Sequence, residues 1–220
     1  MRPSIRGPVL QVALDLISVD DAIRIARQAI RGGADWLECG TPLIKSEGVR
    51  AIRLLRRNFG EVPIVADMKT IDVGSLEAKI AFEAGADIVS ILALADDQTI
   101  LGAIEEAEKY EGMVMADLIN HPDPISRAKQ LEGLGVNIIL IHVGIDQQAY
   151  RGIPYGIVRE IKEEVDCYIA VAGGINDQTA GVAVKSGADI VIVGRYITAS
   201  ENPGERARRV KEAMLSACSV

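Results

Sequence analysis

Acidic side chains and one lysine follow apolar runs in the first third of the chain. They are Asp15, Glu38 and, in the run DMKTID at 67–72, Asp67, Lys69 and Asp72. If the apolar runs are neighbouring strands, about 4.8 Å apart, their carboxylates crowd together. Lys69 stands two residues after Asp67, on the same side of an extended chain. Because opposite charges at short range keep their partners ionised, this pattern predicts a fixed array of charges that can shuttle protons.

A divalent cation is a second way to neutralise such a cluster. Mg²⁺ typically uses one or two carboxylates together with waters and substrate oxygens. We expect Glu38 and Asp67 to be its ligands. A cation held there would bind the carbonyl and hydroxyl oxygens of a sugar and stabilise an enediolate.

Glycines in the last third of the chain indicate a phosphate site. Gly173 and Gly174 follow one apolar run, and Gly194 and Arg195 follow the next. Glycine lets the backbone approach an anion closely, and arginine adds a fork-shaped charged donor. We expect these four residues to bind phosphate, although the two adjacent glycines are also compatible with a simple tight turn.

A repeat shows which elements position these residues. Gly-Ala-Asp at 33–35 recurs at 85–87 and 187–189, and approximately as Gly-Val-Asn at 135–137, at intervals of 52, 50 and 52 residues between the glycines. Each copy follows a helical pattern and precedes an apolar strand, as expected of a glycine that ends a helix. Further strands are expected midway, at 64–67, 113–117 and 168–174, with the first at 9–15. The count is eight.

Eight alternating strands and helices predict an α/β fold, a closed (β/α)8 TIM barrel, as one domain over residues 1–220. Helix signals agree: Ser18, Asp123-Pro124 and either Asp177 or Thr179 open helices, and a last helix is expected from about Pro203 to Ser216. The doubly wound alternative lacks its glycine-rich fingerprint after the first strand. In a barrel, catalytic groups lie where strands end on the C-terminal face, which is where the polar residues stand.

Composition narrows the classes of function. The net charge of −7 disfavours nucleic-acid binding. No apolar stretch approaches the roughly 18 residues that a membrane span needs, so we expect a cytoplasmic protein. Three cysteines without metal-ligand spacing predict reduced thiols: Cys39, Cys167 and Cys218.

Each candidate also has a structural explanation. A DxKxxD run occurs by chance and can be a simple salt bridge, and carboxylates at strand ends can cap the next helix. The two histidines of the chain, His121 and His142, both follow apolar strands. We favour a functional role for His142 and leave His121 open. Asp117 and Asn120, near the end of the strand at 113–117, are polar contacts of undecided role.

The sequence resembles the orotidine 5'-phosphate decarboxylase superfamily, and within it the 3-hexulose-6-phosphate synthase family, from Leu10 to about Ala213. The motifs that carry the resemblance are LQVALDL at 10–16, ECGTPLI at 38–44 with EG at 47–48, ADMKTIDVG at 66–74, EAGAD at 83–87, ADLIN at 116–120, HVGIDQQ at 142–148, AGGI at 172–175 and VGRYIT at 193–198. Orotidine-phosphate decarboxylases have lysine in place of Glu38 and a Pro-Gly turn in place of Gly173-Gly174. The 3-keto-L-gulonate-6-phosphate decarboxylases carry arginine where this chain has Ile145.

The resemblance implies a Mg²⁺-dependent lyase that catalyses the reversible aldol reaction of D-ribulose 5-phosphate with formaldehyde to D-arabino-3-hexulose 6-phosphate, in the ribulose monophosphate pathway. It implies that Glu38 and Asp67 hold the metal and that Asp15 and Lys69 contact substrate hydroxyls or relay protons. His142 would be the acid/base. It also implies a homodimer in which Asp72 reaches into the active site of the partner.

Two other functions stay open at this point. One is decarboxylation of 3-keto-L-gulonate 6-phosphate or orotidine 5'-phosphate. The other is a non-catalytic barrel that only binds a sugar phosphate. The latter needs the phosphate loops but not Asp15, Lys69 and Asp72 together, so the complete set favours an enzyme.

Overall fold

The computed structural model describes residues 3 and 5–218, and its eight parallel strands close into one barrel in chain order, β1 to β8. This confirms the predicted TIM barrel. The strands are β1 (Val9–Leu14), β2 (Trp36–Cys39), β3 (Ile64–Thr70), β4 (Ile88–Leu92), β5 (Met113–Asp117), β6 (Ile138–His142), β7 (Tyr168–Ala172) and β8 (Ile190–Val193).

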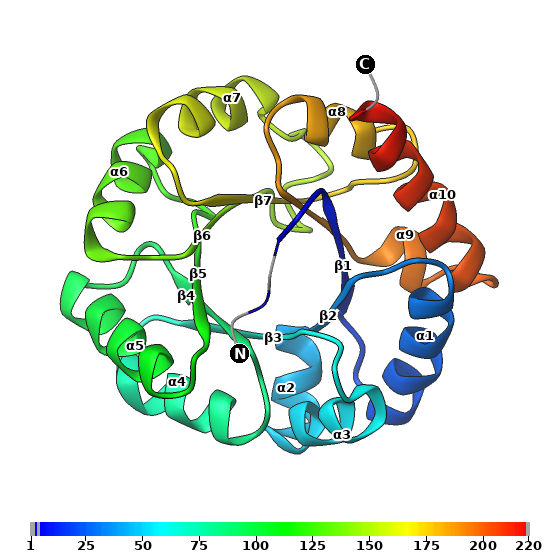
Figure 1. Cartoon of the computed structure of the whole chain (residues 1–220), viewed down its shortest axis with the longest axis horizontal. Helices are drawn as coiled ribbons and strands as arrows, with labels where there is room; N and C mark the ends of the chain where they lie inside the picture. The colour runs from blue at the N-terminus through cyan, green and yellow to red at the C-terminus, as the bar shows by residue number, and fades with distance from the viewer. Residues whose placement is uncertain (1–2, 4, 219–220) are drawn as a thin grey trace.

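Helices form the outer ring around the strands (Figure 1). They are α1 (Val19–Arg31), α2 (Thr41–Glu47), α3 (Arg50–Phe59), α4 (Gly74–Glu83), α5 (Asp97–Lys109), α6 (Pro124–Leu134), α7 (Tyr155–Glu164), α8 (Ala180–Lys185), α9 (Arg195–Thr198) and α10 (Pro203–Ala217). Two helices follow β2 and two follow β8, whereas one helix follows each of the other strands.

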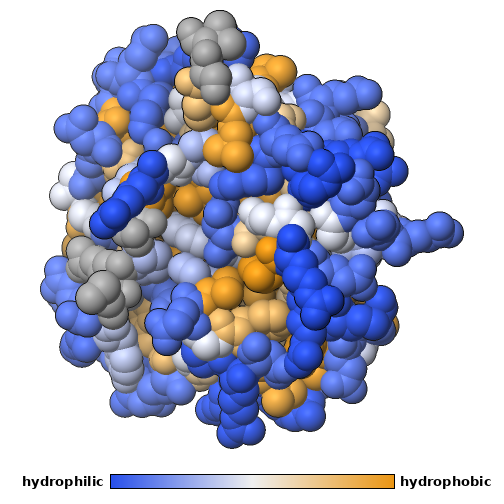
Figure 2. All heavy atoms as spheres, turned by 45° about the vertical axis from the view of Figure 1, so that its right-hand side comes forward, coloured by the Kyte–Doolittle hydropathy of each residue, from blue (hydrophilic) through white to orange (hydrophobic). Residues whose placement is uncertain are grey.

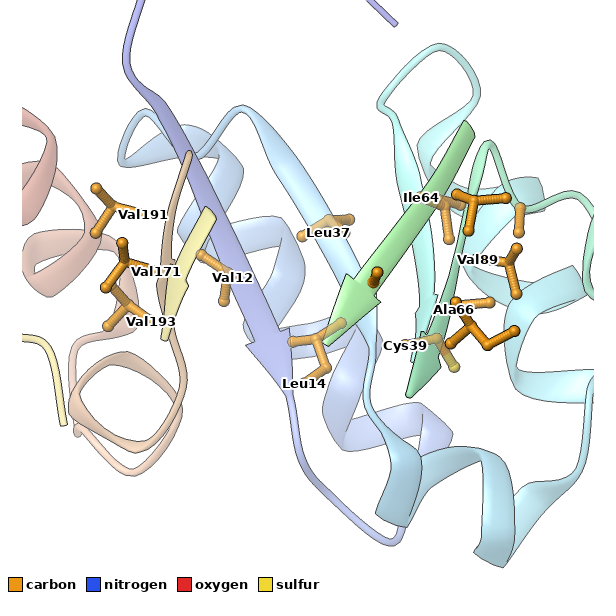
Figure 3. Packing of buried hydrophobic residues seen from close by; sticks show 14 of the residues in the cluster. Val12, Leu14, Leu37, Cys39, Ile64, Ala66, Val89, Val171, Val191 and Val193 are labelled. Carbon is orange, nitrogen blue, oxygen red and sulfur yellow. The ribbon is translucent and has the colours of Figure 1, made fainter. Parts of the chain in front are cut away.

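Each strand is buried on both faces, so its residues alternate between two apolar cores. In β1, Leu10, Val12 and Leu14 belong to the cluster between strands and helices, while Val9 and Ala13 belong to the cluster inside the barrel. Figure 3 shows part of the outer cluster, with Val12 and Leu14 among the residues that pack there. A polar residue on the inner face, such as the buried Gln11, is therefore surrounded by apolar side chains.

The repeated tripeptide ends a helix in every copy, as predicted. Its glycine has φ between +98° and +103° at all four positions, 33, 85, 135 and 187. Its third residue also has a role that the sequence did not indicate, because the side chain accepts a hydrogen bond from the backbone N–H at the start of the preceding strand. The pairs are Asp35 with Leu10, Asp87 with Ile64, Asn137 with Val114 and Asp189 with Ile169, at 2.7–2.8 Å.

Helix boundaries follow the predicted signals with small differences. Ser18 caps α1 and Asp123 caps α6 through their side chains. Thr179 rather than Asp177 precedes α8, without a capping side-chain hydrogen bond, and α10 ends at Ala217 instead of Ser216. Two strand ends were wrong by more than one residue: β7 ends at Ala172 instead of at position 174, before the two glycines with positive φ. β3 does not end at Asp67 but continues to Thr70, because the chain keeps pairing with β4 after a register shift between Ala66 and Thr70.

Hydrophilic side chains cover most of the face in Figure 2, and hydrophobic atoms show mainly in the hollows between them. Among residues 3 and 5–218, no helix is long and apolar enough to cross a membrane. The cysteines form no disulfide within this part of the chain.

Candidate active site

A cavity of about 1100 Å³ opens at the C-terminal ends of the strands. It brings together all of the predicted site residues except Asp72, from both ends of the sequence. Its lining includes Asp15, Glu38, Asp67, Lys69, His142, Gly173, Gly174, Gly194 and Arg195. This confirms the prediction that the ends of neighbouring strands place the three carboxylates close together; it concerns their positions only.

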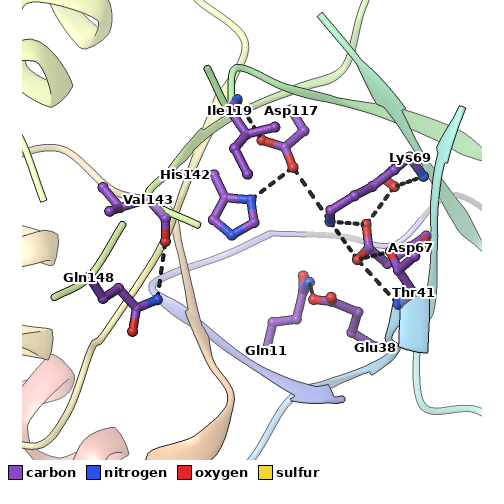
Figure 4. A network of polar contacts seen from close by, with 11 residues as sticks. Gln11, Glu38, Thr41, Asp67, Lys69, Asp117, Ile119, His142, Val143 and Gln148 are labelled. Atoms are coloured by element: carbon purple, nitrogen blue, oxygen red, sulfur yellow. Dashed lines mark hydrogen bonds and ion pairs between the residues drawn. The ribbon is translucent and has the colours of Figure 1, made fainter. Parts of the chain in front are cut away.

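Asp67 and Lys69 form the best-connected pair in the cavity (Figure 4). Lys69 Nζ lies 2.8 Å and 2.6 Å from the two carboxylate oxygens of Asp67. Hydroxyls of Thr41 and Ser90 donate to the same carboxylate, each at 2.7 Å. Burial by itself would raise the pKa of Asp67, but the charge of Lys69 and these hydrogen bonds outweigh it and lower the pKa. Asp67 is therefore a fixed anion.

The backbone at Lys69 explains how the lysine reaches back over the strand. Its φ is +48°, in the left-handed region that β-strand residues rarely adopt, and it lies within the register shift of β3. The N–H of Lys69 donates to Ser90 Oγ at 3.0 Å. Burial would lower the pKa of Lys69, but the charges of Asp67, Asp117 and Glu38 outweigh it and raise that pKa above its usual value. Lys69 is therefore a permanent cation in this site.

Glu38 and Asp15 are the two carboxyl groups of the cluster whose ionised forms are disfavoured. Glu38 is 7% exposed, and its burial, followed by the charges of Asp67 and Asp15, raises its pKa well above the ordinary value. Asp15 is reached by solvent through the cavity mouth. Even so, desolvation and the charge of Asp67 raise its pKa, against the lowering effects of Lys69 and His142. Lys69 thus faces several carboxyl groups, and a further cation beside Glu38 and Asp15 would favour their ionised forms.

The donor set fits Mg²⁺ in part. No group of three or more His, Cys, Asp or Glu side chains is arranged to hold a metal ion in the described part of the chain. Two carboxylates plus waters and substrate oxygens are nevertheless the usual set for Mg²⁺. Glu38 and Asp67, both at the cavity wall, supply such a pair.

His142 is held by a residue whose role the sequence left undecided. Its Nδ1 lies 2.8 Å from Oδ2 of Asp117, which is fully buried (Figure 4). The same oxygen lies 3.6 Å from Lys69 Nζ, and Oδ1 accepts the N–H of Ile119 at 2.9 Å. Asp117 therefore joins the histidine to the lysine. Its position as the last residue of an apolar strand was the available signal.

The two other residues of undecided role, Asn120 and His121, lie in different places. Asn120 lines the cavity with φ of +60°, and its Oδ1 accepts a hydrogen bond from Gln147 Nε2 at 2.6 Å. His121 is not part of the cavity lining. Its Nδ1 accepts the N–H of Asp123 at 3.2 Å, so it shapes the turn before α6.

Backbone conformation favours glycine in the predicted phosphate loop after β7. Gly173 has φ of +123°, and a Cβ there would lie 2.6 Å from the carbonyl oxygen of Val143. Gly174 has φ of +67° and lies beside Gln148, whose Nε2 donates to that same carbonyl at 3.1 Å. The exposed Arg195 forms no ion pair within residues 3 and 5–218, so its guanidinium is available to an anion.

The structure does not bring Asp72 into the cavity. Asp72 is exposed, and its Oδ1 accepts the N–H of Val73 at 2.7 Å. Its flanking residues Ile71 and Val73 are about half exposed, as is Leu76 one turn into α4. Asp72 thus has no place in the site of its own chain.

Sequence reasoning missed four polar residues, three beside the carboxylates and one beside the glycine loop after β7. Thr41 and Ser90 bind Asp67, Gln11 binds Glu38, and Gln148 supports the phosphate loop. Thr41, Gln148 and Gln11 lie within motifs that carry the family resemblance, whereas Ser90 stands out only as a polar residue inside an apolar strand. Cys39 is buried, and burial, with Glu38 and Asp67 nearby, raises the pKa of its thiol to about 12, in agreement with a packing role.

Barrel and site together define a (β/α)8 protein with acid/base groups and glycine-rich loops at the C-terminal ends of its strands. Residues 8–210 match the model of the orotidine 5'-phosphate decarboxylase / HUMPS family, and the chain belongs to that family.

Relatives within the family share nearly the whole chain. The 3-hexulose-6-phosphate synthase of Bacillus subtilis (strain 168) is 38% identical over 94% of this chain and 98% of its own. The solved structure of the Salmonella typhimurium 3-hexulose-6-phosphate synthase matches with a TM-score of 0.90 at 34% identity, over 95% and 99% of the two chains. The 3-keto-L-gulonate-6-phosphate decarboxylase of Vibrio cholerae matches with a TM-score of 0.83 at 26% identity, over 96% and 98%.

Proposed function

We propose that this protein catalyses the reversible aldol reaction between D-ribulose 5-phosphate and formaldehyde, which gives D-arabino-3-hexulose 6-phosphate. The observation that carries the proposal is the continuous chain of contacts from Asp67 through Lys69 and Asp117 to His142, in the same cavity as the glycine loops. The likeness to synthases supports it at 34–38% identity over nearly the whole chain.

The phosphate and carbonyl ends of the substrate would bind at different strands of the cavity wall, and the two places meet where β8 pairs with β1 and Gly194 lies beside Asp15. The loops after β7 and β8, with Gly173, Gly174, Gly194 and Arg195, would hold the phosphate group. The carbonyl end would then lie over β1 to β3, near Asp15 and Lys69. This orientation places the carbons that react next to the charged groups and holds them at a fixed distance from the anchor.

Glu38 and Asp67 would hold Mg²⁺, because a further cation there would favour the ionised form of the buried Glu38 carboxyl group. When bound, the ion would polarise substrate oxygens and stabilise negative charge that develops on them. Lys69 supplies a second, permanent positive charge at the same place, and Thr41 and Ser90 keep the Asp67 carboxylate in one orientation.

His142 would move the proton. With Nδ1 engaged by Asp117, Nε2 is the nitrogen left for the substrate. His142 would remove a proton from C1 of ribulose 5-phosphate, and the C1–C2 enediolate would form. C1 then bonds to the carbon of formaldehyde, and the aldehyde oxygen takes up a proton, which leaves a new hydroxyl. The reverse sequence cleaves that bond and releases formaldehyde.

Decarboxylation of 3-keto-L-gulonate 6-phosphate is the second candidate, favoured by the fold shared with the Vibrio cholerae decarboxylase. Ile145 speaks against it. This residue lines the cavity with an apolar side chain at the position where arginine is expected in those decarboxylases. An isoleucine cannot pair with a substrate carboxylate, so the aldol reaction is the better fit.

We also propose that the protein acts as a homodimer in which Asp72 completes the partner's cavity. The support is the exposed position of Asp72 between Ile71 and Val73, together with its absence from the cavity of its own chain. Apolar side chains of this size at the surface favour burial against another protein.

One assay tests the proposed reaction directly. The protein is incubated with ribulose 5-phosphate, formaldehyde and Mg²⁺, and the loss of formaldehyde is followed with and without EDTA. We expect consumption that EDTA abolishes and added Mg²⁺ restores. Full activity after chelation would contradict the metal role. Absence of formaldehyde consumption, with CO₂ release from 3-keto-L-gulonate 6-phosphate, would establish the second candidate instead.

A further inference from the structure

Gln11 is a fully buried polar residue on the inner face of β1. Its neighbours on that face of the strand, Val9 and Ala13, belong to the apolar cluster inside the barrel. Across the strands it pairs in register with Trp36 on one side and Ile192 on the other, both in the same cluster. An amide among these side chains loses its hydration and needs a partner within the protein.

The amide of Gln11 has one partner within the described residues. Its Nε2 donates to Oε2 of Glu38 at 2.5 Å, and the two side chains point toward one another in Figure 4. Its Oε1 is buried with no hydrogen-bond partner in this part of the chain. The carbonyl oxygen of Gln11 is therefore unused by the described part of the fold, and its amino group is directed at Glu38.

Contact with Gln11 fixes Glu38 from below. Glu38 is opposite Ala13 in the register of β1 with β2, and both residues line the cavity. Gln11 is two residues before Ala13 on the same face, so it lies beneath Glu38 and outside the cavity lining. The bond to Oε2 restrains one carboxylate oxygen. The other, Oε1, accepts no hydrogen bond from the described residues and belongs to a side chain that lines the cavity. The arrangement leaves that oxygen for a cation or a substrate hydroxyl.

We propose that Gln11 is a positioning residue that orients the Glu38 carboxylate for binding a divalent cation, rather than a residue the barrel needs for folding. The proposal rests on the assignment of Glu38 as a metal ligand in the proposed function. Residues that hydrogen-bond to a metal ligand fix its orientation, and their replacement typically weakens metal binding by about 10- to 100-fold.

The test uses two variants of Gln11 and one control. Gln11→Met keeps the length of the side chain without the amide, and Gln11→Asn keeps the amide but shortens its reach. Ser186→Ala is the control, because its hydroxyl is likewise buried without a partner among the described residues, yet it lies outside the cavity lining. Binding of Mn²⁺ to the full-length protein is measured by electron paramagnetic resonance, beside the thermal midpoint, kcat and KM for ribulose 5-phosphate.

Both Gln11 variants are expected to bind Mn²⁺ about tenfold or more weakly than the wild type, and to lose kcat with a smaller change in KM. Ser186→Ala should bind Mn²⁺ as the wild type does. If Gln11→Met fails to fold, Gln11→Asn provides the same comparison.

Wild-type Mn²⁺ affinity in a folded Gln11 variant, with or without a lower thermal midpoint, would overturn the proposal. So would a wild-type chain that binds no Mn²⁺. A wild-type chain that binds Mn²⁺ with the expected dependence on Gln11, but consumes no formaldehyde, would contradict the proposed reaction while supporting the role of Gln11.

Discussion

Nδ1 of His142 lies 2.8 Å from Oδ2 of Asp117, and the carboxylate is fully buried whereas the imidazole faces the cavity. This pairing selects the ring orientation and leaves Nε2 for the substrate. Because Lys69 Nζ is 3.6 Å from the same oxygen, Asp117 connects His142, the proposed base, to the ammonium group of Lys69. Several consequences of this connection can be measured.

Replacing Asp117 with asparagine should lower kcat by about 10²- to 10⁴-fold, the range of general acid–base contributions, because the amide stabilises neither the imidazolium nor the required tautomer. KM for ribulose 5-phosphate should change much less. Steady-state kinetics over pH check this. Asp97→Asn is the matched control, since Asp97 also forms an ion pair, 2.8 Å from Arg127, outside the cavity lining. Near-normal kcat in Asp117→Asn would contradict the role of Asp117.

Replacing Lys69 with methionine should reduce turnover by about 10³-fold, since the permanent cation between Asp67 and Asp117 is lost. Binding of inorganic phosphate should persist, because the glycine loops follow other strands, β7 and β8. Rapid-quench kinetics and calorimetric titration with phosphate measure the two effects. Lys162→Met removes a lysine from a comparable 2.8 Å ion pair with Asp189, outside the cavity lining, and serves as control. Unaltered turnover in Lys69→Met would refute the assignment.

Glu38→Gln should stabilise the chelated protein increasingly as pH rises. The pKa of Glu38 is raised well above its ordinary value, chiefly by burial and then by Asp67 and Asp15. The protonated form therefore favours the fold below the unfolded-state pKa, and that contribution is lost as pH rises through the folded-state pKa. Glutamine lacks this titration. In EDTA, the melting temperature of Glu38→Gln minus that of the wild type should be larger at pH 8 than at pH 5. Each kcal/mol of difference in unfolding free energy corresponds to about 2–4 °C. An equal difference in melting temperature at both pH values would contradict the raised pKa of Glu38.

Gly40→Ala should displace Asp15. A Cβ at this position would stand 2.2 Å from Asp15 Oδ1 and 3.0 Å from the carbonyl oxygen of Leu14. We expect a loss of about 1–3 kcal/mol in unfolding free energy, typical of overpacking, and a lower kcat. Gly133→Ala, in helix α6 with nothing within 4 Å of the added carbon, should be neutral or slightly stabilising. Denaturant unfolding distinguishes the two, and a Gly40→Ala variant as active as the wild type would show that Asp15 tolerates movement.

Much of the fold was predictable because its signals are local and repeated. The glycine of each Gly-Ala-Asp copy needs a left-handed backbone wherever it stands, so it marks a helix end without knowledge of the rest of the chain. The third residue is different. Its bond to the preceding strand, such as Asp87 to the N–H of Ile64, depends on the pairing of two parallel strands that a helix separates in the sequence.

The candidate site likewise has features that the sequence predicts and features that depend on the three-dimensional fold. Strand-end carboxylates, His142 and the glycine loops were predictable from position, because parallel strands present their C-terminal ends on one face. The pairing of Asp117 with His142 was not, since 25 residues separate them and the geometry depends on β5 lying beside β6. Lys69 was correctly placed near Asp67, but the left-handed backbone that turns it toward that carboxylate has no signature in its sequence neighbours.

The central claim is that Glu38, Asp67, Lys69 and His142 act on one sugar phosphate whose anchor lies at the glycine loops. A crystal structure with Mg²⁺ and ribulose 5-phosphate tests it most directly. The account predicts a cation about 2.0–2.1 Å from carboxylate oxygens of Glu38 and Asp67, the phosphate against Gly174 and Arg195, and C1 next to Nε2 of His142. A phosphate bound elsewhere in the cavity, or a cation that avoids Glu38 and Asp67, would contradict it.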